Sequence, residues 1–346
     1  MEDLVKKLSE MRGVSGFEYS FSDEITKIFK NICDECFTDT LGNVVAVKKC
    51  GKDNPLKIMI EAHIDEIGLM VSGIDENGLL SVACVGGIDK RILPSSEVIV
   101  HGSRDIKGVI GAKPPHLQTA DESKKSMKLE DMSIDIGFSK EEAEKLVRVG
   151  TSVTFEQSVG RMCDDTISYK ALDDRAGVAI LGDVLRKIKD KNLGADVYIV
   201  ATVQEEVGLR GARTAANLIN PDISISIDVC HGVTPDNSKD AYDCGSGVVI
   251  SKGPNIHPGL GKRLIDIASE NEIPFEIDVD GGYTGTNAWA IQIAGQGVAT
   301  ALLSLPLKYM HNPVETMKLS DLEATSKLLV KFLEETDEKA VEWLCL

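Results

Sequence analysis

The chain has 346 residues, 42% hydrophobic and 27% charged, which is enough for a large core and one to three domains. Its formal net charge of -17 argues against nucleic acid or an anionic membrane as the main partner. The charged N-terminal segment does not resemble a signal peptide, and no apolar run reaches membrane-spanning length. Eight scattered cysteines, with a lone CxxC at Cys33 and Cys36, favour reduced thiols over a structural zinc site. These features predict a cytoplasmic protein.

The N-terminal part is predicted to form helices followed by strands. Residues 2–11 and 19–31 have the apolar spacing of helices. Strands are expected at 37–40 and 44–48, on either side of a hairpin-like turn. Residues 56–62 form a dense apolar run, which is typical of a strand buried on both faces of an α/β sheet.

Between residues 70 and 161 the sequence changes to short β-rich segments separated by glycines. A helix is expected at 140–146, and residues 114–132 are polar and predicted to form a loop. Strands of a small barrel are expected at 98–101, 107–111 and 152–155. We interpret 70–161 as a separate domain inserted into the chain.

After residue 162, helices and strands alternate. Helices are expected at 174–189, 212–219, 259–271, 287–294 and 320–335, and strands at 196–203, 223–229, 275–277 and 299–305. This alternation predicts a mostly parallel sheet sandwiched by helices. The predicted fold class is therefore α/β, with one discontinuous domain, 1–69 plus 162–346, interrupted by the β-rich, barrel-like insertion 70–161.

Ligands of α/β sheets bind beyond the carboxyl ends of the strands, and acids and histidines gather at those positions in this sequence. The adjacent Glu205 and Glu206 follow one strand. They are interpreted either as part of a cation site or as two acids in a surface loop. His63 ends another strand, either as a ligand or as a buried structural histidine. Asp65 lies two residues further on, where it can share a face with His63 and accept its second N–H.

Further candidates lie at the ends of other elements. Asp173 and Asp174 open a helix, where one suits the N-cap and the other is left to bridge two metals. Their spacing does not decide which is which. Asp228 lies near the end of an apolar strand, and His311 follows the strand at 299–305.

Two histidines, three carboxylates and a spare glutamate match a co-catalytic site for two divalent metal ions. Mixed nitrogen and oxygen ligands favour Zn, with Co or Mn as alternatives, over Ca or Mg. Two such ions about 3.5–4 Å apart activate a shared water, and the spare glutamate can act as general base. The sequence therefore predicts a metal-dependent hydrolase.

The chain resembles the M42 family of metallo-aminopeptidases over nearly its whole length. The resemblance rests on five motifs, at Gly13–Glu18, His63–Gly68, Lys170–Gly177, Glu205–Gly208 and Tyr309–Glu315. It implies an aminopeptidase that acts on short peptides. It also implies a dimerisation role for the inserted domain and a homo-oligomer in which dimers assemble into a dodecamer.

The resemblance also implies a role for each candidate residue. One metal would be held by His63, Asp173 and Asp228, and the other by Asp173, Glu206 and His311. Asp173 would bridge the two metals. By the same resemblance, Glu205 is expected to be the catalytic base and Asp65 to orient His63.

Two departures from the family pattern leave the preferred N-terminal residue open. Asn287 stands where relatives commonly have Asp, and Lys308 stands where they commonly have Arg. Two alternative functions also remain. One is a deacylase, carboxypeptidase or N-blocked-peptide hydrolase that uses the same metals, and the other is a non-catalytic assembly protein.

Overall fold

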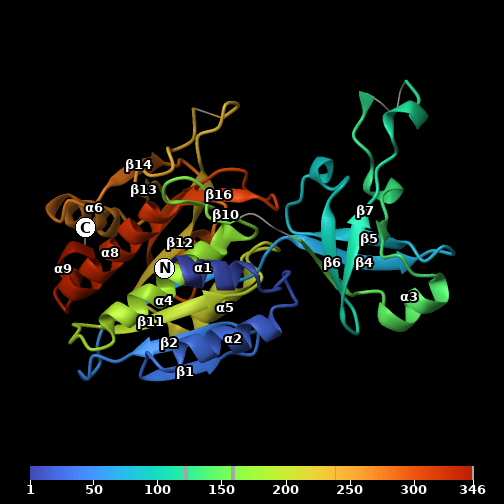
Figure 1. Ribbon diagram of the computed structural model, residues 1–346. Helices are drawn as coiled ribbons and strands as arrows, with labels where there is room; N and C mark the ends of the chain where they lie inside the picture. The colour runs from blue at the N-terminus through green and yellow to red at the C-terminus, as the bar shows by residue number, and fades with distance from the viewer. Residues whose placement is uncertain (121–123, 157–159, 238, 345–346) are drawn as a thin grey trace.

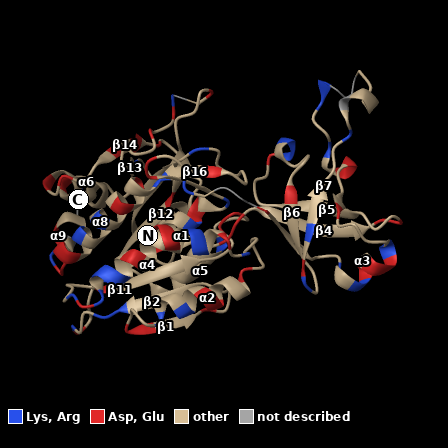
Figure 2. Cartoon of the chain, in the orientation of Figure 1, with Lys and Arg blue, Asp and Glu red and all other residues tan. Residues whose placement is uncertain are grey.

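The computed structural model describes residues 1–120, 124–156, 160–237 and 239–344, which form a layered α/β part and a smaller β-barrel (Figure 1). Acidic and basic residues are interspersed over both parts (Figure 2). Among the described helices, none is long and apolar enough to cross a membrane.

One sheet of eight strands forms the centre of the α/β part. In their order across the sheet, the strands are β1 (Glu35–Thr38), β2 (Val44–Lys48), β11 (Asp196–Thr202), β3 (Lys57–His63), β12 (Ile223–His231), β15 (Ala299–Leu307), β13 (Val248–Lys252) and β14 (Phe275–Val279). The central strands β11, β3, β12 and β15 are parallel. Strands β1 and β2 at one margin, and β13 at the other, pair antiparallel with a neighbour. The predicted α/β class is confirmed, with a parallel centre and mixed margins.

Helices cover both faces of this sheet because the central strands are apolar on both sides. On β3, Ile58 and Ile60 pack into one core cluster, whereas Met59 between them packs into another. The first cluster is covered by α1 (Glu2–Ser9), α2 (Tyr19–Phe29), α4 (Leu172–Ile188), α6 (Pro258–Glu270) and α8 (Leu319–Glu335). The second is covered by α5 (Arg210–Ile219) and α7 (Asn287–Gln292), and the short α9 (Ala340–Leu344) packs beside α6. Burial on both faces is the property that the dense apolar run predicted.

The inserted segment forms a closed barrel with its own hydrophobic core. Around the barrel, the strands are β4 (Gly68–Ile74), β5 (Leu80–Val85), β8 (Ile134–Asp135), β7 (Asp105–Ile110), β6 (Glu97–His101) and β9 (Ser152–Phe155). Helix α3 (Lys140–Leu146) begins at a capping box formed by Ser139 and Glu142. The polar segment 114–132 contains short 3₁₀ turns at Pro115–Leu117 and Leu129–Asp131, and residues 121–123 within it lie outside the described part. The predicted barrel is confirmed, while the domain boundaries stay a prediction.

Three strands of the α/β part were not expected from the sequence, and in the barrel the sequence named only the segments that form β6, β7 and β9. Strand β13 follows Gly245 and Gly247 and joins the sheet near its edge. Strands β10 (Thr166–Tyr169) and β16 (Glu315–Lys318) form a separate two-stranded sheet. These strands are short, and each pairs with a segment far away in the chain, so local alternation carries little signal for them.

Candidate metal centre

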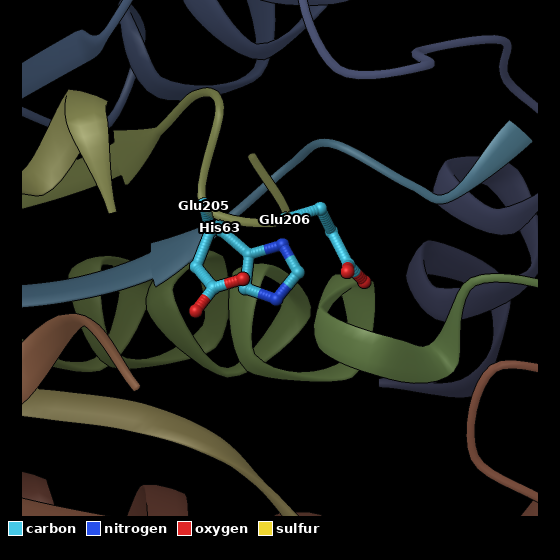
Figure 3. Close-up of side chains that lie close together, drawn as sticks. All are labelled: His63, Glu205 and Glu206. Carbon is cyan, nitrogen blue, oxygen red and sulfur yellow. The ribbon is translucent and has the colours of Figure 1, made fainter. Parts of the chain in front are cut away.

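The register of the parallel strands brings the candidate residues to one edge of the sheet. Strand β3 ends at His63, which lies beside Thr202 at the end of β11, and Glu205 and Glu206 follow shortly after. Strand β12 pairs with β3 from its first residue, so Asp228 reaches the same edge. Figure 3 shows the carboxylates of Glu205 and Glu206 on either side of the His63 ring.

Asp173 lies between the two candidate histidines. Nε2 of His63 is 3.0 Å from Oδ1 of Asp173, and Nε2 of His311 is 3.3 Å from Oδ2. Asp174 is engaged differently: its carboxylate accepts the N–H of His63 at 3.3 Å and the N–H of Gly177 at 3.2 Å. Asp174 therefore caps the backbone, whereas Asp173 presents one oxygen to each histidine. This geometry favours Asp173 as a bridging carboxylate.

The second ring nitrogen of each histidine is held by a carbonyl oxygen. Nδ1 of His311 donates to the carbonyl oxygen of Gly87 in the barrel part at 2.8 Å. Nδ1 of His63 lies 3.1 Å from the carbonyl oxygen of Asp65 and 3.5 Å from its carboxylate. Because Nδ1 is the donor in both rings, Nε2 is the atom that would bind a metal, in place of the proton that it holds toward the carboxylates in the protein alone.

Asp65 also connects the histidine to the two glutamates. Its carboxylate accepts the N–H groups of Glu205 at 3.0 Å and Glu206 at 3.2 Å, and the hydroxyl of Ser15 at 2.6 Å. Burial by itself raises the pKa of Asp65, but the contacts with His63 and Ser15 outweigh burial and leave the pKa below its usual value. A charged Asp65 can therefore hold in place the segment that follows β11 and carries Glu205 and Glu206.

Among the described residues, three groups of side chains bring potential ligand atoms within 4.8 Å of one another. The groups are His63, Asp173 and Asp228; Asp173, Glu206 and His311; and His63, Glu205 and Glu206. The first two groups contain the residues predicted to hold two metals, and they share Asp173. The third group places Glu205 beside these ligands. The donor set of imidazole nitrogens and carboxylate oxygens fits two divalent ions of the zinc type.

The crowding of acids in this site gives them unusual proton affinities. Burial raises the pKa of Glu205 to about 9 and that of Asp228 to about 8. The charge of His63 lowers both pKa values, and neighbouring carboxylates add to the rise. The hydrogen bonds to Asp173 and Glu206 raise the pKa of His311 to about 11. In the protein alone, the carboxylates are therefore stabilised by protons and imidazolium rings. Divalent cations would supply the same positive charge more strongly.

A cavity of about 540 Å³ opens over the candidate metal centre. Glu205 lines it with only 9% of its surface exposed, and no described residue donates a hydrogen bond to its carboxylate. The cavity has the size of a small-ligand site and places its bound molecule against the candidate ligands and the candidate base.

Glu315 supports the site in a way that the sequence did not indicate. Its buried carboxylate accepts the N–H of Asp173 at 3.1 Å and the N–H of His311 at 2.8 Å. The same motif contains His311 and Glu315, but the partner Asp173 lies 142 residues away in the chain. Only the folded chain reveals that one carboxylate fixes both backbones.

The other residues singled out in the sequence lie outside the ligand groups. Asn287 donates to Oε2 of the buried Glu61 at 2.8 Å and to the hydroxyl of Thr202 at 3.1 Å. Lys308 pairs through its backbone with Thr316 and does not line the cavity. Cys33 and Cys36 are free thiols.

Sequence comparison matches residues 42–328 to the family described as M42 glutamyl aminopeptidase. The lysyl aminopeptidase of Pyrococcus furiosus is 38% identical over 339 residues, covering 96% of each chain. The glutamyl aminopeptidase of Lactococcus lactis is 28% identical over 350 residues, covering 98% of each chain.

Two solved structures described as peptidases are similar to this chain over nearly its whole length. An aminopeptidase from the archaeon Desulfurococcus kamchatkensis superposes with a TM-score of 0.91 at 38% identity, covering 99% of this chain and 96% of the other. The TET1 peptidase of Pyrococcus horikoshii, which assembles into a tetrahedron or a large octahedral shell, has a TM-score of 0.86 at 34% identity. That alignment covers 96% of this chain and 99% of the other.

Proposed function

Because the chain belongs to the M42 glutamyl aminopeptidase family, we propose that it is a metal-dependent aminopeptidase that removes N-terminal residues from short peptides. The observation that carries the proposal is the position of Asp173, which presents one oxygen to His63 and the other to His311. This arrangement suits two metal ions bridged by one carboxylate.

Two divalent ions would be held by the two overlapping ligand groups. His63, Asp173 and Asp228 would bind one ion, and Asp173, Glu206 and His311 would bind the other. The ligand types favour Zn, with Co or Mn as alternatives. When bound, such ions supply Lewis-acid activation of a water molecule and of the scissile carbonyl group.

Glu205 is proposed as the base that moves the proton. Its carboxylate accepts a proton from the attacking water and returns it to the amine that leaves as the C–N bond breaks. Asp65 accepts the N–H of Glu205 and contacts the ring of His63, so it fixes the position of the proposed base relative to the proposed ligand. The pKa of Glu205 is about 9 in the protein alone, and it would fall with divalent cations bound nearby, so that the carboxylate could act as a base.

The charge of the cavity supports action on a free N-terminus. Among the described residues, no Lys or Arg lines it, and beyond the proposed metal ligands and base it is lined by Asp240, Asp278 and Asp280. Such a wall attracts a cationic α-amine and repels the α-carboxylate that a carboxypeptidase must bind. This observation favours the aminopeptidase over that alternative.

We also propose that the chain forms a homo-oligomer, with dimers assembling into a dodecamer. The tetrahedral assembly of the similar TET1 peptidase supports this proposal. Light scattering on the purified protein, combined with electron microscopy, measures the mass and shape of the particle. A monomer at micromolar concentration would contradict the proposal.

A panel of aminoacyl anilides tests the proposed activity. The full chain, loaded with Zn, Co or Mn, is expected to release the anilide, and a chelator should abolish turnover until metal is restored. N-acetylated peptides serve as the comparison, because faster hydrolysis of blocked than of free peptides would indicate the deacylase or N-blocked-peptide hydrolase instead. An absence of chelator-sensitive turnover on every substrate, with metal bound, would refute the enzyme proposal.

A further inference from the structure

Among the described residues, the hydrogen bonds that hold Glu205 involve its backbone alone. Its N–H donates to Asp65 at 3.0 Å, and its carbonyl oxygen accepts the N–H groups of Gly208 and Leu209, both at 2.9 Å. No described residue donates a hydrogen bond to its carboxylate. The position of the proposed base therefore depends on the backbone of the segment 203–211 that carries it.

The two ends of the segment 203–211 are joined by Asn43, which is fully buried. Oδ1 of Asn43 accepts the N–H of Val203 at 3.0 Å, and its Nδ2 donates to the carbonyl oxygen of Gly211 at 3.0 Å. The N–H of Gly211 also donates to the carbonyl oxygen of Val203 at 2.9 Å. The segment is thus closed into a loop by contacts that do not involve its middle residues.

The residue before the proposed base, Gln204, has a strained backbone. Its φ of 56° lies in the left-handed region, which is unfavourable for a residue other than glycine and persists only where the surroundings support it. The N–H of Gln204 donates to Oε1 of Glu18 at 3.1 Å, across 186 residues of the chain. Among the described residues, this is the one side-chain hydrogen bond to the backbone of Gln204.

Glu18 is fixed in place by its own backbone. Its carbonyl oxygen accepts the N–H groups of Phe21 and Ser22 at 2.8 and 2.9 Å, where α2 begins. The residue is only 3% exposed and forms no ion pair with any described residue. Burying an acid without a cation costs stability, so a structural role alone gives a poor account of a glutamate at this position.

We propose that Glu18 is a positioning residue for the proposed base, because it holds Gln204 in the conformation that directs Glu205 toward the candidate metal centre. This inference rests on the proposed aminopeptidase function and adds a residue to the same site. Glu206 follows in the same segment, but a bound metal would anchor its carboxylate, whereas the carboxylate of Glu205 has no such anchor. Loss of the contact should therefore slow proton transfer more than it weakens metal or substrate binding.

The test compares Glu18→Gln with Glu18→Met on the metal-loaded full chain. The two side chains fill nearly the same volume, but only glutamine keeps an acceptor for the N–H of Gln204. With the best aminoacyl p-nitroanilide of the panel, Glu18→Met should lower kcat by roughly 10–100-fold, because small displacements of a reacting group have effects of this size. KM and Zn affinity should stay close to the wild-type values, and Glu18→Gln should retain most of kcat. Glu24→Met, on α2 where the native side chain pairs with Lys27, is the control and should change none of these quantities.

A second comparison shows whether Glu18 acts through the base. In the Glu205→Gln background the base is already absent, so adding Glu18→Met should cause no further loss of kcat, because residues that act as a unit have non-additive effects. Glu18→Ala serves as a second variant without an acceptor, and circular dichroism with urea unfolding shows which variants retain the fold.

The outcomes separate this inference from the proposed function. A rise in KM at unchanged kcat, a loss of metal that accounts for the loss of kcat, or equal losses with and without Glu205 overturns the inference while the aminopeptidase activity stands. If the wild type hydrolyses no anilide, the proposed function fails, and amide hydrogen exchange on the metal-loaded protein still decides the inference. Faster exchange at Gln204 and Glu205 in Glu18→Met but not in Glu18→Gln supports it, and equal exchange in all three proteins overturns it.

Discussion

Replacing Glu315 with Gln removes one of the two acceptors that hold the backbones of Asp173 and His311. The native carboxylate accepts both N–H groups, at 3.1 and 2.8 Å, and is buried. Burial and the charge of Asp173 raise the pKa of Glu315 well above its usual value, and the two N–H donors oppose this rise because they favour the carboxylate form. In Glu315→Gln, an NH₂ group faces one of the N–H groups and leaves it without an acceptor, at a cost of about 1–3 kcal/mol.

This cost should appear as weaker metal binding. His311 has a φ of 59°, a left-handed conformation that costs about 1–2 kcal/mol for a residue other than glycine, so its backbone depends on support. Loss of an outer-shell contact of this kind typically weakens metal affinity by about 10–100-fold. That range agrees with about 1–3 kcal/mol at about 1.4 kcal/mol per factor of ten.

The assay is a titration of the metal-free protein with Zn or Co, followed by competition with a chelator. Glu323→Gln, an exposed residue on α8, is the matched control and should bind metal like the wild type. Circular dichroism and urea unfolding of the metal-free variants show whether the fold is retained. If Glu315→Gln binds both metals within about twofold of the wild-type affinity, well under the expected loss, the reasoning is wrong.

Three other substitutions test the base, the contact with the barrel and a buried acid. Glu205→Gln should keep its metal but lose about 10²–10⁴-fold in kcat, and unchanged turnover would remove Glu205 from the mechanism. Gly87→Ala places a Cβ 3.1 Å from Nδ1 of His311 and should weaken metal binding by about tenfold. In the control Gly111→Ala, the new Cβ meets no atom within 4 Å, so metal affinity should stay unchanged. Equal metal affinities of the two variants would contradict this prediction. Burial, then the charge of Asp65, raises the pKa of Glu18 from 4.5 to about 7. The folded protein therefore favours the neutral carboxyl, and this contribution to the free energy of unfolding is fully present below pH 4.5 and is lost as the pH rises through about 7. Relative to Glu18→Gln, the chelated wild type should therefore lose up to about 3 kcal/mol between pH 4.5 and about 8 in urea unfolding, and parallel pH curves would refute this.

The parts of the fold that follow from local patterns were predictable from the sequence. The apolar run before His63 indicated a strand buried on both faces, and β3 has that position in the sheet. The rule that ligands lie beyond the carboxyl ends of strands then selected residues that the structure brings within a few ångströms of one another. Strand β13 was missed because its five residues carry too short a pattern to stand out from the loops around it.

Details of the site depend on contacts that no local pattern contains. Asp173 and Asp174 are neighbours of the same type, and only their backbone conformation decides which one faces the histidines. The support from Glu315 and Gly87 comes from segments that meet only after folding. Asp278 and Asp280 line the cavity because the edge strand β14 ends beside the space over the candidate metal centre. Sequence reasoning therefore selected the acids and histidines that lie together, and the contacts around them depend on the fold.

The hydrogen bond from His311 to Gly87 makes the barrel a component of the candidate catalytic unit. The barrel part supplies the acceptor that fixes the tautomer of a proposed metal ligand, 224 residues away in the chain. By thermodynamic reciprocity, any partner that favours this placement of the barrel must strengthen metal binding, and metal binding must favour the same placement to the same degree. A chimera that exchanges the barrel between relatives therefore also exchanges part of the candidate site, and metal binding in it would depend on how closely the new loop reproduces the position of one carbonyl oxygen.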